Sequence, residues 1–87
     1  MEFKKKYNVA LNNLVVQMKF SDLASKCNSE VTAENDVEGY VVNAKSVLGF
    51  FSLDLNKPVT ITINNPQDAA LIEESLAEEN ISFEVVA

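Results

Sequence analysis

The sequence contains no histidine and no arginine, and it has only one cysteine. Without an imidazole, the chain cannot use histidine as a nucleophile, a general base or a phosphate carrier. A single cysteine cannot form an internal disulfide, and it excludes a zinc site built from several thiolates. Without arginine, lysine side chains and helix ends are the only groups left to bind phosphate or carboxylate.

Long apolar runs are also missing. No stretch approaches the roughly 20 residues that span a bilayer. The lysines at 4–6 precede Tyr7-Asn8-Val9 rather than the apolar core of a signal peptide. We therefore expect a cytoplasmic protein with no membrane segment, and no cofactor is expected from the sequence.

The charge balance is acidic. The sequence has seven lysines and thirteen carboxylate side chains, which gives a formal net charge of −6. A polyanionic partner would be repelled over most of such a surface, so nucleic acid is not expected as a partner.

The composition is that of a globular protein. The 87 residues are 47% hydrophobic and 23% charged, and glycine and proline occur only twice each, which argues against disorder. No shift in composition marks a boundary, so residues 1–87 are predicted to form one domain with a modest core.

Alternating apolar and polar residues predict strands, and apolar residues spaced three and four apart predict helices. The strands are expected at 2–9, 30–33, 39–43, 59–63 and 81–85, with the second and third joined as a hairpin. The helices are expected at 13–27 (capped by Asn12 or Asn13), at 47–53 (capped by Ser46), and after Asn65-Pro66 with Ala69, Ile72 and Leu76 on the apolar face.

This order of elements predicts an α+β fold, an open-faced sandwich. A four-stranded antiparallel sheet is covered by three helices on one face, in the order β-α-β-β-α-β-α, and an extra C-terminal strand follows. That last strand can pair with an edge of the sheet or with another copy of the chain. The architecture alone is compatible with many functions.

Two blocks narrow the choice: Ala24–Val31, and the more specific Val42-Asn43-Ala44-Lys45-Ser46-Val47-Leu48-Gly49-Phe50-Phe51-Ser52-Leu53. They resemble the HPr family, the small phosphocarriers of the bacterial sugar phosphotransferase system. Family members commonly read valine-asparagine-alanine-lysine-serine, an aliphatic pair, glycine, two large apolar residues, serine and leucine. The order of elements extends the resemblance from about Tyr7 to Leu76.

The residues that carry phosphate in that family are absent. Aligned without gaps, the family's Gly-Leu-His-Ala-Arg-Pro stretch falls on residues 11–16, so Asn13 replaces the phosphohistidine and Val15 replaces the arginine. An amide nitrogen is not nucleophilic, because its lone pair is delocalised, and valine offers no charge to a phosphate. The resemblance therefore implies a variant without carrier activity, in which Asn13 only caps a helix.

Ser46 matches the serine that a dedicated kinase phosphorylates in many family members from Gram-positive bacteria. A phosphate there would sit at a helix N-terminus, with Lys45 adjacent. The alternative is a serine that simply caps the helix.

Val47, Leu48 and Phe51 match the apolar patch through which family members dock on enzymes, on the serine kinase and on a transcriptional regulator. We expect Leu48 and Phe51 to be exposed for docking and Phe50 and Leu53 to pack in the core.

Other candidates for chemistry have simpler explanations. Cys27 lies on the apolar side of the first helix, which predicts a buried small hydrophobe. The carboxylates of the last helix are expected to form a solvated acidic face, and their spacing alone does not make a metal site; they are Glu73, Glu74, Glu78 and Glu79.

Two classes of function remain. The first is a regulatory or adaptor protein that binds partners through the second helix, with Ser46 as a possible switch. The second is an assembly role, in which residues 81–86 pair two chains into a homodimer and Ser46 is only a cap. A phosphotransferase with a different acceptor residue is the weakest option.

Overall fold

The computed structural model of the chain describes residues 3–11, 13–35, 40–46, 48–49, 52–53 and 57–86. Within these ranges the elements follow the order β1 (Lys5–Val9), α1 (Leu14–Ser25), β2 (Val31–Glu34), β3 (Val41–Asn43), β4 (Val59–Ile63), α3 (Pro66–Glu78) and β5 (Phe83–Val85). The strands form one sheet in the order β3-β2-β4-β1-β5, and every neighbouring pair is antiparallel. The predicted α+β class and antiparallel sheet are confirmed.

Strand β4 lies at the centre of the sheet, as predicted. It pairs with β1 on one side, where Val59 is opposite Val9, and with β2 on the other, where Ile63 is opposite Val31. Val59, Ile61 and Ile63 are fully buried. The threonines between them point the other way, because successive side chains of a strand alternate between the two faces.

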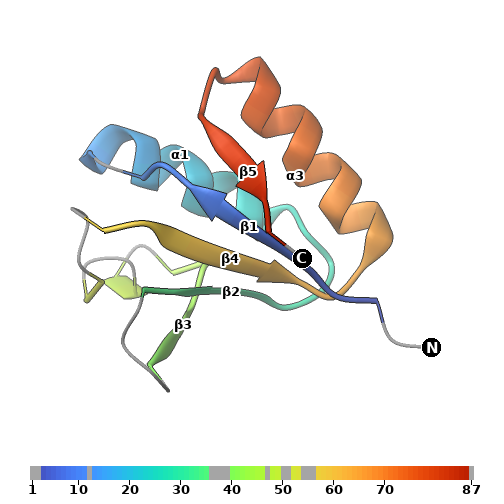
Figure 1. Cartoon of the computed structure of the whole chain (residues 1–87), viewed down its shortest axis with the longest axis horizontal. Helices are drawn as coiled ribbons and strands as arrows, with labels where there is room; N and C mark the ends of the chain where they lie inside the picture. The colour runs from blue at the N-terminus through green and yellow to red at the C-terminus, as the bar shows by residue number, and fades with distance from the viewer. Residues whose placement is uncertain are drawn as a thin grey trace.

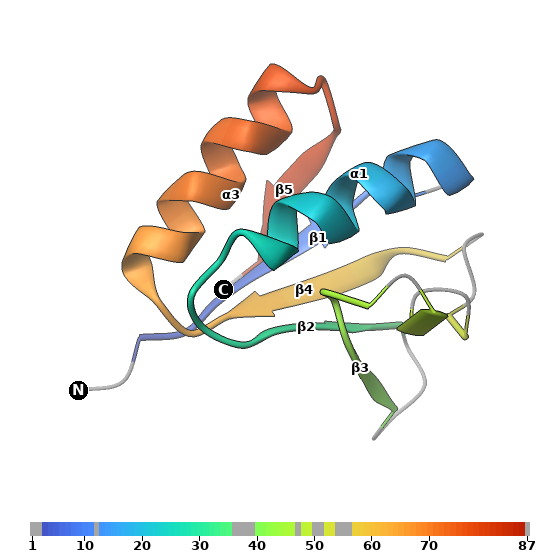
Figure 2. The same ribbon diagram turned by 180° about the vertical axis from the view of Figure 1, so that it is seen from behind.

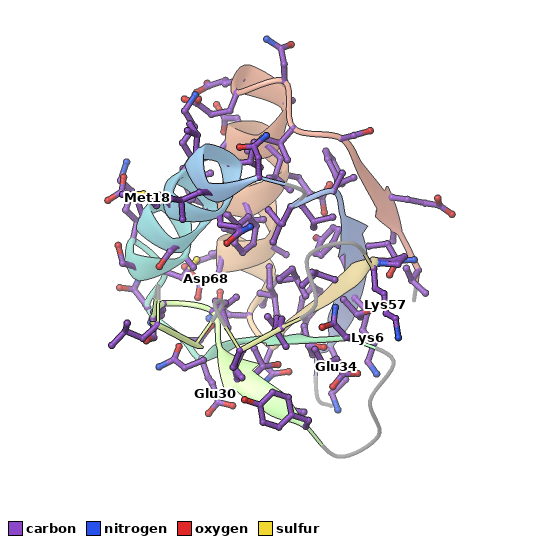
Figure 3. The ribbon with its side chains drawn as sticks, turned by 90° about the vertical axis from the view of Figure 1, so that its left-hand side faces the viewer. Lys6, Met18, Glu30, Glu34, Lys57 and Asp68 are labelled. Atoms are coloured by element: carbon purple, nitrogen blue, oxygen red, sulfur yellow. The ribbon has the colours of Figure 1, made fainter. Side chains whose placement is uncertain are left out.

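Both helices cover the same face of the sheet, and the other face is open (Figures 1 and 2). The covered face carries the core, whose largest fully buried apolar side chains are Tyr7, Phe20, Ile61, Ile63, Ile72, Leu76, Val31 and Val59. The open face is polar over β1, β2 and β4, where its partly exposed side chains are Lys6, Asn8, Thr32, Glu34, Thr60 and Thr62. Lys6 and Glu34 are seen on this side in Figure 3.

Helix α1 begins at the expected cap. The side chain of Asn13 accepts a hydrogen bond from the backbone N–H of Val16 at 3.0 Å, which satisfies one of the free donors of the first turn. Phe20 and Ala24 are buried, and Cys27 is buried just beyond the helix end. The helix stops at Ser25, two residues before the predicted end, and Lys26 forms its C-cap.

Helix α3 also begins as predicted. Asn65 accepts hydrogen bonds from the N–H groups of Gln67 and Asp68, and Pro66 occupies the first helical position. The helix ends at Glu78, with Glu79 as its C-cap, and the next residue, Asn80, has a φ of 56°, in the left-handed region. The N–H of Asn80 bonds the carbonyl of Ala77 at 3.2 Å, and that of Ile81 bonds the carbonyl of Leu76 at 2.9 Å. This pair of bonds is a Schellman motif.

Strand β5 covers the outer edge of β1. Tyr7, Asn8 and Val9 pair with Val85, Glu84 and Phe83. The rings of Tyr7 and Phe83 meet edge to face, with centroids 6.0 Å apart. The predicted C-terminal strand is therefore confirmed, and it joins the sheet of its own chain.

Other details differ from the sequence prediction, or fall partly on residues that the structure does not describe. The first strand begins at Lys5 rather than at residue 2, because Lys5 pairs with Ile63, the last residue of β4. Of the helix expected at 47–53, Leu48 and Gly49 are helical, whereas Val47, Phe50 and Phe51 lie outside the described residues. Two helices rather than three are therefore defined in the described part of the chain. Neither of these two is long and apolar enough to cross a membrane.

Candidate functional site

Asn13 stands at the exposed N-terminal end of α1, the position that the sequence comparison assigned to a phosphohistidine. Its carboxamide oxygen is occupied by the N–H of Val16. Val15, at the arginine position, has an exposed fraction of 62%. The group at this end of the helix is thus a cap beside an exposed apolar side chain, with neither a nucleophile nor a cation at these two positions.

The exposed side of α1 is apolar in its first turns. Leu14 and Met18 are half exposed and lie one turn apart, and Val15 is close to both. Met18 projects outward from α1 in Figure 3. We call Leu14, Val15 and Met18 the α1 apolar surface. Sequence analysis missed this surface because it assigned only the buried face of the helix.

Ser46 lies in a turn that follows β3. The N–H of Lys45 bonds the side chain of Asn43 at 2.9 Å, and the N–H of Ser46 bonds the Asn43 carbonyl at 3.1 Å. The hydroxyl of Ser46 accepts from the N–H of Gly49 at 3.3 Å, and Ser46 is partly exposed. This is the geometry of the predicted capping interaction.

Gly49 is suited to this turn by its lack of a side chain. A Cβ atom on Gly49 would lie 3.1 Å from the carbonyl oxygen of Asn43, which is closer than most such contacts. The glycine therefore lets the segment after Ser46 pack against the end of β3.

Lys45 ties the Ser46 turn to the loop that follows α1. Its ammonium group donates to the backbone carbonyl of Cys27 at 3.0 Å. Burial raises the pKa of the Cys27 thiol, the nearby Asp68 carboxylate raises it further, and Lys45 opposes both effects. A thiol held protonated in this way is a poor nucleophile, which agrees with the expected structural role of Cys27.

Leu48 is the most exposed large apolar residue among those described, with an exposed fraction of 77%, and Leu53 is buried. The predicted exposure of Leu48 and the predicted burial of Leu53 are confirmed. Val47 and Phe51, the other two residues assigned to docking, lie outside the described residues, as does Phe50. No hydrogen bond joins Asn13 to Ser46 within the described ranges, so the two positions form separate features.

The interpretation of these acidic residues as a wholly solvated face was wrong for Glu73, which is only partly exposed. Glu73 accepts from the ammonium of Lys5 at 2.7 Å and from the phenol of Tyr7 at 2.5 Å. Those two hydrogen bonds lower the pKa of Glu73, against the opposing effect of burial. Glu79, just past the helix, pairs with Lys19 of α1 at 3.2 Å.

Among the residues that the structure describes, no cluster of three or more potential metal ligands is present. The arrangement therefore offers two features: a capped, uncharged helix end with an apolar surface, and a serine turn beside a lysine.

A small open-faced α+β domain with these features matches one family model. The model is PTS-HPr, described as the PTS HPr component phosphorylation site, and it matches residues 16–78. The chain therefore belongs to the HPr family of the phosphotransferase system. The match begins beyond Asn13 and Val15 and includes Ser46. No curated protein matches the chain.

Proposed function

We propose that this HPr-family chain does not carry phosphate on histidine and acts as a regulatory or adaptor protein in the bacterial cytoplasm. The observation that carries the proposal is Asn13. Its side chain is a helix cap, and a delocalised amide cannot accept a phosphoryl group as an imidazole does. The whole sequence contains no histidine that could replace it.

The surroundings of Asn13 support the same proposal. A phosphoryl group needs cationic or N–H donors around it, whereas the exposed neighbours of Asn13 are the α1 apolar surface. Leu14, Val15 and Met18 favour contact with an apolar protein surface over contact with a phosphate. The helix end is thus better suited to docking than to phosphoryl transfer.

Ser46 is the residue that we propose as a switch. It is partly exposed, and its hydroxyl already faces the N–H of Gly49. A phosphate on this oxygen would gain that donor and the neighbouring charge of Lys45. The modified serine would then stabilise its own turn while presenting about two negative charges to a partner.

Docking is proposed to use Leu48 with Lys45, Val47 and Phe51. The exposure of Leu48 supports this assignment, because its side chain is accessible to a partner. The proposed partners are proteins, namely a serine kinase of the HPr type and a transcriptional regulator.

The test is the intact mass of the protein after incubation with ATP and an HPr-type serine kinase. We expect one added phosphate, and none in Ser46→Ala. Ser52→Ala is the matched control, because Ser52 is exposed nearby and its hydroxyl donates to the carbonyl of Gly49. Absence of phosphate on the unmodified chain, or its retention in Ser46→Ala, would remove Ser46 as the switch.

An assembly role is the second candidate, and the outer edge of β5 is the observation in its favour. Val85 and Val86 are about half exposed beside it, and an unpaired edge can bind a second strand. The strand has only three residues, and its inner edge is occupied by β1. Sedimentation of the intact chain and of Val85→Lys distinguishes this role: a dimer that the substitution dissociates would favour it.

A further inference from the structure

Helix α1 buries two polar side chains while it exposes apolar ones. Gln17 and Ser21 have exposed fractions of 0% and 3% and lie on the face that also buries Phe20 and Ala24. In an ordinary amphipathic helix these positions would be apolar. Because burying a polar group without a partner costs about 1–3 kcal/mol, a buried polar atom that lacks a partner calls for an explanation.

Only half of the Gln17 carboxamide has a partner within the described structure. Its nitrogen donates to the carbonyl of Leu11 at 3.3 Å. Its oxygen, Oε1, is buried and has no hydrogen-bond partner there. Exchanging the two amide atoms does not help, because the carbonyl of Leu11 needs a donor. The missing group must therefore be a donor that reaches Oε1.

Ser21 is placed to share that donor. It follows Gln17 by one helical turn on the same buried face, and residues at this spacing have Cβ atoms about 5–6 Å apart. The residue keeps slight access to solvent, with an exposed fraction of 3%. Two hydrogen bonds of about 2.8 Å through the oxygen of one water molecule can join polar atoms up to about 5.6 Å apart.

We propose that Gln17 Oε1 and the Ser21 hydroxyl hold one internal water molecule between α1 and the sheet. Water can donate to Oε1 and still exchange a hydrogen bond with the serine, which can both donate and accept. Buried waters commonly satisfy polar groups that the chain leaves unpaired. Ser21 retains slight exposure, whereas Gln17 has none, so the serine side is the route by which the water enters.

The site also accounts for how the first half of α1 is held. The Gln17 bond to Leu11 fixes the helix to the chain that leaves β1, and the water would connect the same amide to the next turn. Polar contacts thus anchor the segment beneath the α1 apolar surface. This inference does not depend on whether Ser46 is phosphorylated or on the proposed function.

A crystal structure at better than about 1.5 Å, together with water–protein nuclear Overhauser effects in solution, tests the proposal. We expect a fully occupied water within about 3 Å of Oε1 and a long-lived water signal at the Gln17 side-chain amide. Ser21→Ala should abolish that signal, whereas Ser25→Ala should retain it, because Ser25 is exposed and bonds the carbonyl of Asp22. A protein donor on Oε1, or a dry site, would overturn the proposal.

A double-mutant cycle gives an independent readout of the shared water. Gln17→Met and Ser21→Ala each remove one of its two partners, and their effects on the folding equilibrium constant should be coupled by at least about threefold. Gln17→Met paired with Ser25→Ala should show no coupling. Additive effects of Gln17→Met and Ser21→Ala would contradict a water held by both residues.

Discussion

Asp68 and Ser29 are joined by two hydrogen bonds although 39 residues separate them. The carboxylate of Asp68 accepts from the backbone N–H of Ser29 at 2.9 Å and from its hydroxyl, and it also accepts from the N–H of Asn28 at 3.2 Å. These bonds fix the first turn of α3 to the loop between α1 and β2. They give both oxygens of this almost fully buried carboxylate at least one donor.

Asp68→Asn should therefore lower the free energy of unfolding by about 2 kcal/mol at pH 7, because an amide keeps one acceptor oxygen and loses the charge. The hydroxyl of Ser29 is the main cause that holds the pKa of Asp68 below its ordinary 3.8, against the effect of burial. A lowered pKa contributes stability above the unfolded value, and this is lost as the pH falls through the folded value.

The difference in the free energy of unfolding between the unmodified protein and Asp68→Asn should consequently become smaller below about pH 4. Chemical denaturation over a pH series measures it, and the exposed Asp22→Asn serves as the control. A gap that stays constant with pH would show that the charge of Asp68 contributes nothing.

The contribution of Tyr7 to stability should depend on pH in the opposite direction to that of Asp68. Burial raises the pKa of its phenol well above the ordinary 10.0, and the hydrogen bond to Glu73 and the charge of Glu73 raise it further. A raised pKa contributes stability that is present below the unfolded value and is lost as the pH rises through the folded one. The protein should thus lose stability above about pH 10 as the unfolded phenol ionises.

Tyr7→Phe isolates this contribution. It should cost about 1 kcal/mol at pH 7 through the lost hydrogen bond, and the difference from the unmodified protein should shrink above about pH 10. Denaturation monitored alongside tyrosinate absorbance tests both parts. A Tyr7 phenol that ionises in the folded protein near its ordinary pKa would contradict the buried hydrogen bond to Glu73.

Because Asn80 has a left-handed backbone conformation, two substitutions at this position should change the stability in opposite directions. Asn80→Gly should stabilise the fold by about 0.5 kcal/mol, because glycine adopts this conformation without steric cost. Asn80→Ala should destabilise it by about 1 kcal/mol, because a Cβ disfavours the left-handed region. Thermal unfolding of both variants measures the difference, and equal midpoints would contradict the Schellman end of α3.

Leu48 is exposed and Leu53 is buried, although they are only five positions apart in the sequence. Leu53→Ala should cost about 2–3 kcal/mol of unfolding free energy, whereas Leu48→Ala should change it by less than about 0.5 kcal/mol. If Leu48 docks the kinase, its alanine variant should be phosphorylated at least about tenfold more slowly at low substrate concentration. An unchanged rate for a folded Leu48→Ala would remove this residue from the docking surface.

The elements that sequence predicted correctly are those set by local rules. Asn13 and Asn65 cap their helices because their side chains reach the next free N–H groups. The alternation in β4 placed that strand at the centre of the sheet, and Leu48 and Leu53 were correctly divided between surface and core.

The features that sequence missed depend on contacts between distant parts of the chain. Glu73 looked solvated because no lysine lies near it on α3, yet its partners Lys5 and Tyr7 are 68 and 66 residues away. The burial of Gln17 and Ser21 was also missed, because the periodicity of α1 was assigned from its apolar residues alone. Such pairs become visible only once the topology brings β1 beneath α3 and places α1 on the sheet.

The most direct test of the central claim is to incubate the protein with phosphoenolpyruvate and the first enzyme of the phosphotransferase system, with a histidine-containing family carrier as a positive control. The intact mass is then read without acid, since phosphohistidine is labile. We predict that the control gains one phosphate and that this chain gains none, because Asn13 caps α1 and no imidazole is present. A phosphate on this chain under those conditions would show that another residue accepts the phosphoryl group, and the chain would then be a carrier.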